Sequence, residues 1–483
     1  MGLFVPVTCY DGPMLSRWAG LALCTVMLCG ARSAVADETR SLTRDAALRL
    51  AAERNAALMV SSLERARLDA VADTARRPYL PELTIESAAR ENAAGADKQR
   101  AIDTVGTLSY ASPYGQSISV AGTLTTGLTG SQQNARSLTI EVSQALLRGG
   151  FHPGGGADLR QADLDVKIAR ELYRNQLNQL LRQTDRAYWD FAFAREDVEI
   201  RRRSRDRARA QFEETRENIR RGLLAPGEIY VVEENVVNFD DSLIRAEETL
   251  ALAESALRRL LNVPPTTTLI ASSSIDTSLI ASAPEAESLG IAAAKHPAVI
   301  AAKLAADRAD VGIGADVRRS LPQLDVFGSF GISSSTTNDL LQNVPGERQI
   351  RGGLRLSLPV YWGPDTARVR RARTELTQRR CDVRDAENAA ATAVHDAATR
   401  IRAREQRLEL TARLLELAQK KLDVEREKYK SGLSTLADVV RFQRDLDTAS
   451  SNALRARVDL LAARTEMLAA RGDLHESLQV TIR

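Results

Sequence analysis

Two long heptad series, joined by one short turn, constrain this chain more than any other feature. Between Asp365 and His475, apolar residues recur every seven positions on both sides of a turn at 430–437. Such a repeat is typical of a coiled-coil seam, and Gly432 can adopt the positive φ that reverses a chain at a helix C-terminus. The sequence therefore predicts an antiparallel helical hairpin. The first series is Val394, Ile401, Leu408, Leu415, Leu422 and Tyr429, and the second is Val439, Leu446, Ala453, Leu460, Met467 and Leu474.

This hairpin is too long to belong to a compact domain. At ~1.5 Å per residue its first helix alone would extend roughly 100 Å, whereas a small globular domain is ~30 Å across. Mostly small residues lie three positions after the second series and would let the two backbones approach closely: Phe442, Ala449, Ala456, Ala463 and Ala470. We therefore expect a rod that projects from the rest of the protein.

The same plan occurs twice along the chain. Leu80-Pro81-Glu82-Leu83 corresponds to Leu321-Pro322-Gln323-Leu324, and a turn at 221–227 corresponds to the one at 430–437. Heptad positions again follow the first turn, at Ile229, Val236, Leu243, Leu250 and Leu257. We expect a first repeat at 37–262, a linker at 263–284 and a second repeat at 285–483. The expected elements are a helix at 42–77 with Thr43 as its N-cap, a strand pair at 82–147 and a hairpin at 157–262, then a helix at 285–319, a strand pair at 323–360 and a hairpin at 365–475.

Both strand regions alternate apolar with polar or small residues. In the second region Leu324, Val326, Phe330 and Ile332 alternate with residues such as Asp325, Ser329 and Ser333, and Ile350, Leu354 and Leu356 alternate with Arg351, Arg355 and Ser357. A half-buried soluble sheet shows the same alternation. Cleaved export, the lack of an apolar helix of spanning length, and strands of roughly ten residues favour an outer-membrane wall. Tyr361-Trp362 fits either an interfacial aromatic belt or a packed strand end.

Four strands per chain cannot close a barrel, and an open sheet edge is not tolerated in lipid. Chains must therefore combine. Two copies would give eight strands with an interior filled by side chains, and three would give twelve strands with a lumen.

The amino terminus predicts export. An apolar run at 18–29 is followed by Ala34-Val35-Ala36, a pattern that signal peptidase cleaves, so residues 1–36 read as a signal peptide and the mature chain would begin near Asp37. The run is too short for a membrane span of ~20 residues. Met14 is an alternative start that gives a more ordinary signal length.

The sequence shows no pattern of catalytic or cofactor-binding residues. Of the four cysteines only Cys381 lies in the mature chain, which excludes a disulfide framework. The four histidines, His152, His296, His395 and His475, lie far apart, and we expect the last two on helix surfaces and no metal site. The glycine-rich stretch 149–156 has no following Lys-Ser or Lys-Thr for a nucleotide phosphate. We therefore predict neither an enzyme nor a cofactor.

The net charge of the chain also does not predict a polyanionic or polycationic partner. Lys plus Arg number 66 and Asp plus Glu 63, which leaves a net charge of +3. The basic run at 201–205 lies among acidic residues of the same helical pattern and is read as a solvated helix face. We expect no nucleic-acid binding.

The two hairpins, the spacing Gly222/Glu228 and Gly432/Asp438, and the motif Tyr429-x-x-Gly432 resemble those of the TolC-like outer membrane efflux proteins. The resemblance covers essentially all of the mature chain. It implies an α+β fold in which long antiparallel coiled-coil hairpins join a four-strand contribution to a trimeric twelve-stranded transmembrane β-barrel. It also implies a homotrimer in outer-membrane lipid with a long periplasmic extension. Such proteins are passive exit ducts for an inner-membrane pump and its periplasmic adaptor protein.

The resemblance also implies site residues. In the family a carboxylate in the first turn, a tyrosine before the second and an arginine within it hold the periplasmic end closed, and acids after the second turn ring the pore. Glu228, Tyr429 and Asp438 match this gate, whereas Ser434 replaces the arginine and Arg441 stands where a second acid is common. Glu228 can also be read as a first-turn acid stabilised by the helix dipole by ~0.3 to 1 kcal/mol.

The turns themselves are the expected adaptor contact. They lie at the far end of the rod and carry short side chains beside glycine, so helices of an adaptor could pack close to the backbone. The residues are Gly222, Leu223, Leu224, Ala225, Gly432, Leu433, Ser434 and Thr435.

One alternative from a different class stays open. The chain could be an exported structural coiled-coil scaffold with a soluble β domain and no pore. Heat-modifiable migration and partition into the outer-membrane fraction would separate the two. Within the favoured interpretation, the sequence does not disclose whether the cargo is a drug, a metal or a polypeptide.

Overall fold

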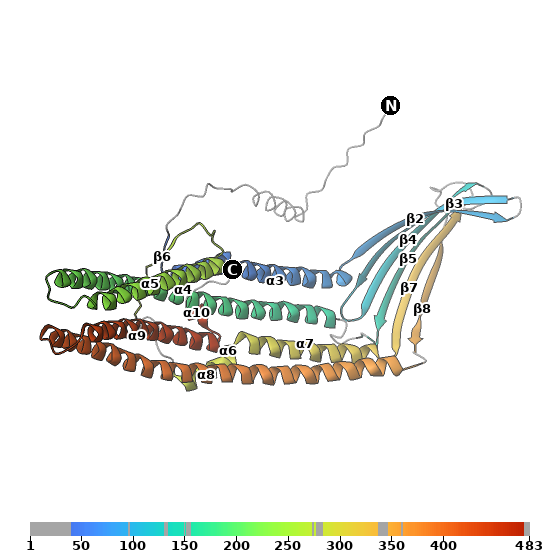
Figure 1. Cartoon of the computed structure of the whole chain (residues 1–483). Coiled ribbons are helices and arrows are strands. Elements are labelled where there is room, and N and C mark those ends of the chain that lie inside the picture. Colours follow the sequence, from blue (N-terminus) through green and yellow to red (C-terminus); the bar gives the residue numbers. More distant parts are fainter. Residues whose placement is uncertain are drawn as a thin grey trace, which may run out of the picture.

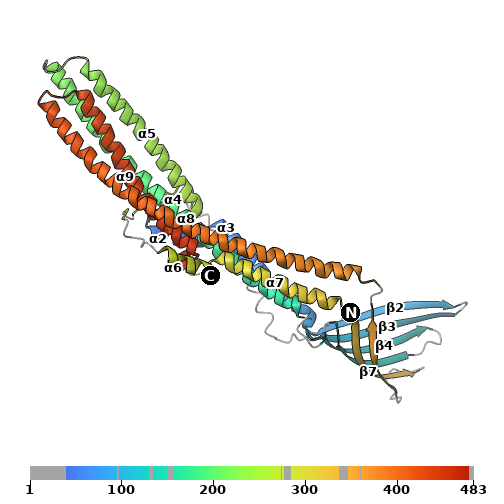
Figure 2. The same cartoon turned by 90° about the horizontal axis from the view of Figure 1, so that it is seen from below.

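The computed structural model describes residues 40–94, 97–129, 134–148, 150, 156–272, 275–276, 284–336, 346–358 and 361–477. The predicted signal peptide and His152 therefore lie outside the described residues. Figure 1 shows a long helical rod with a curved sheet at one end and two helical turns at the other, and Figure 2 shows the same rod from below. The long helices run side by side along the rod in both views.

The elements occur in two comparable series. The first is β1 (Arg40–Leu42), α2 (Arg44–Arg54), α3 (Ala56–Ala75), the short 3-10 helix Arg77–Tyr79, β2 (Glu82–Ala94), β3 (Asp97–Ala111), β4 (Gln116–Thr129), β5 (Asn134–Ala145), α4 (Ala157–Arg220) and α5 (Glu228–Leu261). The second is β6 (Leu269–Ala271), α6 (Glu285–Lys295), α7 (Pro297–Arg319), β7 (Gln323–Thr336), β8 (Glu347–Ser357), α8 (Gly363–Lys430), α9 (Leu436–Arg471) and α10 (Leu474–Ser477).

The expected single helices at 42–77 and 285–319 are each two helices. Asn55 and His296 have extended backbones, with ψ of 125° and 121°, and separate α2 from α3 and α6 from α7. The Asn55 side chain accepts hydrogen bonds from the backbone N–H groups of Ala57 and Leu58, so it caps the second helix. Thr43 is confirmed as the first N-cap, since its hydroxyl oxygen accepts from the N–H of Ala46 at 3.2 Å.

The expectation of four strands is wrong, because the structure has six in one antiparallel sheet of order β2-β3-β4-β5-β7-β8. The region 82–147 contains four strands rather than two. Four strands need two more reversals than a strand pair, and one of them is Ser112-Pro113-Tyr114-Gly115. Its Gly115 N–H donates to the Ser112 carbonyl at 3.1 Å, and Gly115 has φ of 81°. Proline and glycine are the residues that such a turn favours, so the signal was present in the sequence.

The alternation of side chains is confirmed, and it extends across all six strands in register. One row on the apolar face runs from Leu83 through Leu108, Val120, Ile140 and Phe330 to Ile350. The adjacent row on the other face runs from Glu82 through Ser109, Ser119, Glu141 and Ser329 to Arg351. The sheet therefore has one apolar face, and its large side chains are exposed there. Sheets that face water on one side bury the apolar face, whereas a membrane wall presents it to lipid.

The heptad seams are buried as predicted. Val394, Ile401 and Leu422 of α8 face Val439, Leu446 and Leu460 of α9, and each is at most 8% exposed. In the other hairpin Leu243 and Leu257 of α5 are likewise buried. The heptad seams therefore join α8 to α9 and α4 to α5.

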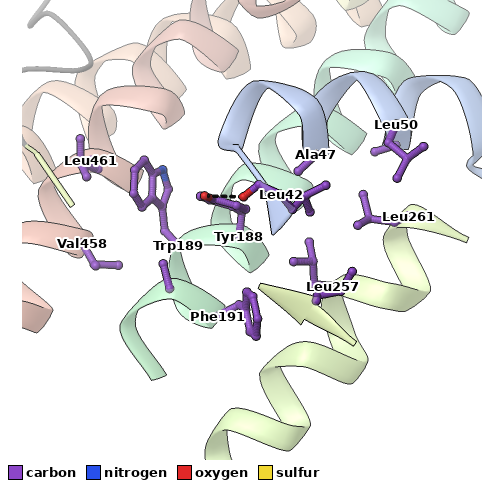
Figure 3. Packing of buried hydrophobic residues seen from close by; sticks show 13 residues of the cluster. Leu42, Ala47, Leu50, Tyr188, Trp189, Phe191, Leu257, Leu261, Val458 and Leu461 are labelled. Atoms are coloured by element: carbon purple, nitrogen blue, oxygen red, sulfur yellow. Dashed lines mark hydrogen bonds between the residues drawn. The ribbon is translucent and has the colours of Figure 1, made fainter. Parts of the chain in front are cut away.

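A cluster of large apolar side chains lies where α2, α4, α5 and α9 meet (Figure 3). Tyr188 and Trp189 of α4 are fully buried and meet edge to face, with ring centroids 5.4 Å apart. The Tyr188 hydroxyl donates to the Leu42 carbonyl at 3.1 Å, which attaches β1 to the rod. β1 pairs in parallel with β6, so the segment between the halves is also held here. Helices from both halves contribute, through Leu257 and Leu461 among others.

Among the described residues, one stretch has the length and apolar composition of a membrane span, Glu285–Arg319. The expectation that no such stretch exists is therefore wrong by that criterion. In the structure it consists of α6 and α7, and α7 lies along α4 and α8 in the rod. The Arg308 guanidinium contacts the Asp165 carboxylate at 2.5 Å and Lys303 contacts Glu387 at 2.9 Å, so this helix presents charged side chains to its neighbours.

Candidate functional site

The two turns at the end of the rod have the same backbone geometry. Gly222 and Gly432 have φ of 73° and 72°. The next residue donates back five positions, from Leu223 N–H to the Asn218 carbonyl and from Leu433 N–H to the Lys428 carbonyl, both at 2.9 Å. This is the Schellman arrangement, which uses a left-handed residue to close a helix C-terminus. Glycine is favoured at both positions because other residues are strained at positive φ.

The turn side chains project away from the rod. Leu223 and Leu433 are 69% and 79% exposed, and space around a Cβ at either glycine is empty within 4 Å. Ser434, which stands at the family's arginine position, donates to the Glu425 carboxylate of its own hairpin. Thr435 caps α9 by accepting from the Asp438 N–H at 3.2 Å. The turns thus offer two exposed leucines on an ordered backbone.

A small apolar cluster joins the two hairpins just behind the turns. Val232 of α5 packs with Leu436 and Val440 of α9, and all three are buried. Tyr429 and Ile229 cover this cluster and are partly buried. Val232 lies 204 and 208 positions before its two partners in the chain, so their contact places the first turn beside the second.

Tyr429 and Glu228 lie near each other but do not share a hydrogen bond within the described chain. Burial raises the pKa of the Tyr429 hydroxyl, and the carboxylates of Glu228 and Glu214 raise it further. A raised phenol pKa keeps the hydroxyl neutral at physiological pH, so it stays a hydrogen-bond donor. The single chain thus brings the two expected gate residues together without forming the bond.

Asp438 and Arg441 are one helical turn apart at the start of α9. Their closest charged atoms are 4.0 Å apart, and the two side chains are 40% and 66% exposed. The Arg441 guanidinium also lies over the Phe442 ring, 4.9 Å from its centroid. The positive charge therefore sits close enough to offset part of the Asp438 charge, weakly because both groups face solvent.

The structure also contains polar contacts between the two hairpins that the sequence did not predict. The Ser204 hydroxyl of α4 donates to the Asp447 carboxylate of α9 at 2.5 Å, and Arg207 donates to the same oxygen at 2.9 Å. Burial raises the pKa of Asp447, opposed by these donors. Asp447 directly follows the seam residue Leu446, so an acid flanking a heptad position was the available signal.

The three histidines that the structure describes, His296, His395 and His475, do not gather into one site. His395 is exposed, as expected, and its Nδ1 lies 2.8 Å from a Glu285 carboxylate oxygen. The expectation for His475 is wrong, because it is 3% exposed and its Nδ1 lies 3.0 Å from Asn178 Oδ1 of α4. Burial lowers the pKa of His475, and the Arg174 charge lowers it further. Over the part of the chain that the structure describes, no His, Cys, Asp and Glu cluster could hold a metal.

The sequence matches the family model described as "Outer membrane efflux protein" over residues 47–263 and 289–473. These segments include both turns, both hairpins and the six strands of the large sheet, whereas β1 and β6 lie outside them. A comparison with curated proteins finds no match.

Several solved structures share the fold. CusC superposes with a TM-score of 0.71 at 15% identity, covering 89% of this chain and 91% of CusC. VceC from Vibrio cholerae gives 0.67 at 15% identity, covering 89% and 96%. The open state of MtrE from Neisseria gonorrhoeae gives 0.67 at 16% identity, covering 89% and 88%. Their descriptions name transmembrane channel formation, an outer membrane protein and an outer membrane channel.

Proposed function

This chain belongs to the outer membrane efflux protein family, and we propose that it is the outer-membrane exit duct of a tripartite efflux or type I secretion system. The family is one of channel proteins, so the chain is a channel protein rather than an enzyme. The observation that carries the proposal is the sheet whose single apolar face spans every strand and stays exposed, continuous with a rod that ends in two exposed turns. In this assignment the sheet lies in lipid and the rod extends into the periplasm.

We propose that the duct is a homotrimer. A sheet of a few strands leaves two unpaired edges, and unsatisfied backbone groups are not tolerated in the hydrocarbon region. Joining copies of the chain removes these edges. The two series of elements, each with a helix leading into strands and a long hairpin leading back, support two repeats within each copy.

Transport through such a duct is passive. The described residues contain neither a metal cluster nor a nucleotide motif that could drive it, so the driving force is assigned to an inner-membrane pump that acts through a periplasmic adaptor. The contact with the adaptor is assigned to the exposed turns around Gly222 and Gly432. The alternative of a scaffold without a pore does not account for a large exposed apolar sheet face, because water would not solvate it.

Conductance tests the proposal directly. Purified mature protein is reconstituted in planar lipid bilayers, and discrete channel openings are expected. The same preparation is fractionated to show partition into the outer membrane and heat-modifiable migration. Protein that folds and partitions but never conducts, with or without the gate substitutions given below, would contradict a duct and favour the scaffold.

A further inference from the structure

Four exposed arginines lie on one face of α8, in the part of that helix next to the sheet. Arg370 and Arg384 precede Arg402 by 32 and 18 residues, which are about nine and five turns at 3.6 residues per turn. They therefore share the face with which Arg402 and His395 contact the Glu285 carboxylate of α6, at 3.4 and 2.8 Å. We call the following set the outer arginines: Arg370, Arg373, Arg380 and Arg384.

The face of α8 that carries the outer arginines is the outer side of the rod. α6 packs on that face and belongs to neither hairpin, so inside a duct it would fill the passage. Ala393 precedes Arg402 by nine residues, or about two and a half turns, and so lies on the opposite face. There it lines a cavity together with Asn178 of α4 and Glu466 of α9. The outer arginines therefore lie on the side away from the passage.

The charges on this part of α8 are sorted by face. On a wheel of 3.6 residues per turn, Glu375 and Asp382 lie on the side away from the outer arginines. Arg368 and Arg379 also lie on other faces, and they contact Asp365 and Asp382 of their own helix at 3.6 and 3.3 Å. Among the described residues, no ion pair involves an outer arginine. A face that carries one sign of charge attracts a partner of the opposite sign, so the expected partner is anionic.

The end of the sheet marks where the hydrocarbon region ends in the proposed duct. Leu356 at the end of β8 is 58% exposed on the apolar face. Tyr361 and Trp362 follow directly before α8 and are 76% and 40% exposed. Tyrosine and tryptophan are enriched at membrane–water interfaces, where an amphipathic ring lies at the level of the headgroups. The outer face of α8 therefore begins next to the lipid headgroups, as Figure 1 shows from its position beside β8.

The first two outer arginines lie within reach of those headgroups. At ~1.5 Å per residue, Arg370 and Arg373 lie roughly 10 and 15 Å along α8 from Gly363. Side chains on a helix lean toward its N-terminus, which for α8 is the end at the sheet, and a long arginine side chain can extend its charge to the headgroup region. Arg380 and Arg384 lie roughly 25 and 30 Å from Gly363, which is too far for such a contact.

We propose that Arg370 and Arg373 bind the phosphate groups of anionic phospholipids in the periplasmic leaflet of the outer membrane. This inference rests on the proposed function, which places the sheet in lipid. A guanidinium can donate two parallel hydrogen bonds to one phosphate. A basic residue next to an anionic membrane surface strengthens binding by about fivefold. The lipid is favoured over an acidic protein because the arginines continue directly from the lipid-facing side of the sheet.

Trp362 can report which lipid lies beside the two arginines. Of the three tryptophans, Trp18 lies in the predicted signal peptide and Trp189 is fully buried, so Trp362→Phe gives the background signal. The mature protein is reconstituted in liposomes of equal amounts of phosphatidylglycerol and phosphatidylethanolamine, and one of the two lipids carries bromine on its acyl chains. We expect brominated phosphatidylglycerol to quench Trp362 at least about twofold more than brominated phosphatidylethanolamine.

Substitutions test whether this preference comes from the two arginines. Arg370→Gln with Arg373→Gln should make the two lipids quench equally, whereas Arg370→Lys with Arg373→Lys keeps both charges and should keep a preference. Arg380→Gln with Arg384→Gln removes the same charge from the same face, further from the membrane than a Debye length of ~8 to 10 Å, and should keep the full preference. Arg371→Gln removes a charge at the same level on another face and should also keep it. Heat-modifiable migration checks that each variant is folded.

Three results would overturn the inference. The first is equal quenching by the two lipids in the parent, and the second is a preference that the Arg380 and Arg384 variant or the Arg371 variant loses as completely as the Arg370 and Arg373 variant. The third is a lower dissociation temperature of the Arg370→Gln and Arg373→Gln trimer in lipid-free detergent, which would mean that an acidic group of another copy binds these arginines. If neither lipid quenches Trp362 in the parent, the sheet does not lie in lipid, and the proposed function itself is contradicted.

Discussion

A buried pair of charged residues stabilises the packing of two helices in the rod. The Arg44 guanidinium lies 2.5 Å from an Asp185 carboxylate oxygen, and the two side chains are 12% and 1% exposed. Burial raises the pKa of Asp185, although Arg44, Thr465 and Trp189 all oppose that rise. Arg44 is the first residue of α2, so this pair attaches α2 to α4. The pair forms only when the two helices pack together, because each helix supplies one of the two side chains.

Arg44→Ala should destabilise the rod strongly, because it leaves the Asp185 charge buried without its partner. Such a loss costs on the order of 3 to 5 kcal/mol. Because the pKa of the Asp185 carboxyl is raised in the folded state, its ionised form lowers the free energy of unfolding at pH values above that pKa. This loss of stability disappears as the pH falls through the pKa. The deficit in thermal midpoint between the variant and the parent should therefore shrink on going from pH 8 to pH 5.

The matched control is Arg67→Ala, which removes one partner of the exposed Arg67–Glu64 pair on α3. Its thermal midpoint should remain close to that of the parent at both pH values. A deficit for Arg44→Ala that does not change with pH would mean that Asp185 does not titrate in this range.

Arg441→Asp should increase block of the open channel by divalent cations. The change removes the positive charge 4.0 Å from Asp438 and places a second acid one turn away, so three copies would present six carboxylates in place of three carboxylates whose charge is partly offset. Block is measured as the reduction of single-channel current with added Mg²⁺. Arg444→Asp is not a suitable control because Arg444 contacts Asn235, so Arg457→Asp, further along α9, serves instead. Unchanged block would place Asp438 away from the pore.

At the scale of elements, the same Schellman turn ends both α4 and α8, and the apolar cluster behind the turns joins the two hairpins. The gate residues therefore sit at a junction between elements rather than on one of them. Tyr429 and Glu228 lie on different hairpins. A small movement of one hairpin relative to the other would therefore change the distance between these two side chains.

Tyr429→Phe combined with Glu228→Gln should raise single-channel conductance in planar bilayers. A phenol bound to a carboxylate contributes on the order of 1.5 to 3 kcal/mol, and three such bonds between hairpins would bias a closed end. Because the bond is absent within one chain, it would have to form when the hairpins shift or between copies. Conductance equal to that of the parent would eliminate the latch and leave Glu228 as a first-turn acid.

Gly432→Leu should abolish transport while leaving the yield of trimer in the membrane unchanged. Empty space surrounds Gly432, so bulk there would meet only a partner such as the adaptor. The positive φ adds backbone strain of roughly 1 to 2 kcal/mol for any other residue. Gly432→Ala carries that strain without the bulk and should retain transport. If both variants transport, the turn is not a close contact, and if both fail, strain rather than contact is responsible.

At the scale of the whole molecule, the isolated chain leaves the apolar face of its sheet and the two edges of that sheet uncovered. The apolar side chains from Leu83 to Ile350 and the unpaired edges of β2 and β8 need lipid and further copies. Purified mature protein in detergent is therefore expected to be a trimer by native mass spectrometry. A monomer that keeps its full β content would contradict the assembly.

The heptad seams, the reversals at Gly222 and Gly432 and the alternation along the strands were all predictable from the sequence. Each depends on residues at most seven positions apart, so periodicity and a glycine suited to positive φ suffice to indicate it. Thr43 as a cap belongs to the same class, because a side chain three residues from its N–H partner acts locally.

The number of strands, the burial of His475 and the contacts at Asp185 and Asp447 were decided by the tertiary structure. The residues from Ser112 to Gly115 indicate a turn, but only the pairing of β3 with β4 shows that a separate strand lies on each side of it. His475 is buried because Asn178, almost three hundred residues earlier, lies across from it. Local patterns determine which face of an element is apolar, whereas partners distant in the chain determine what covers that face and how many neighbours the sheet contains.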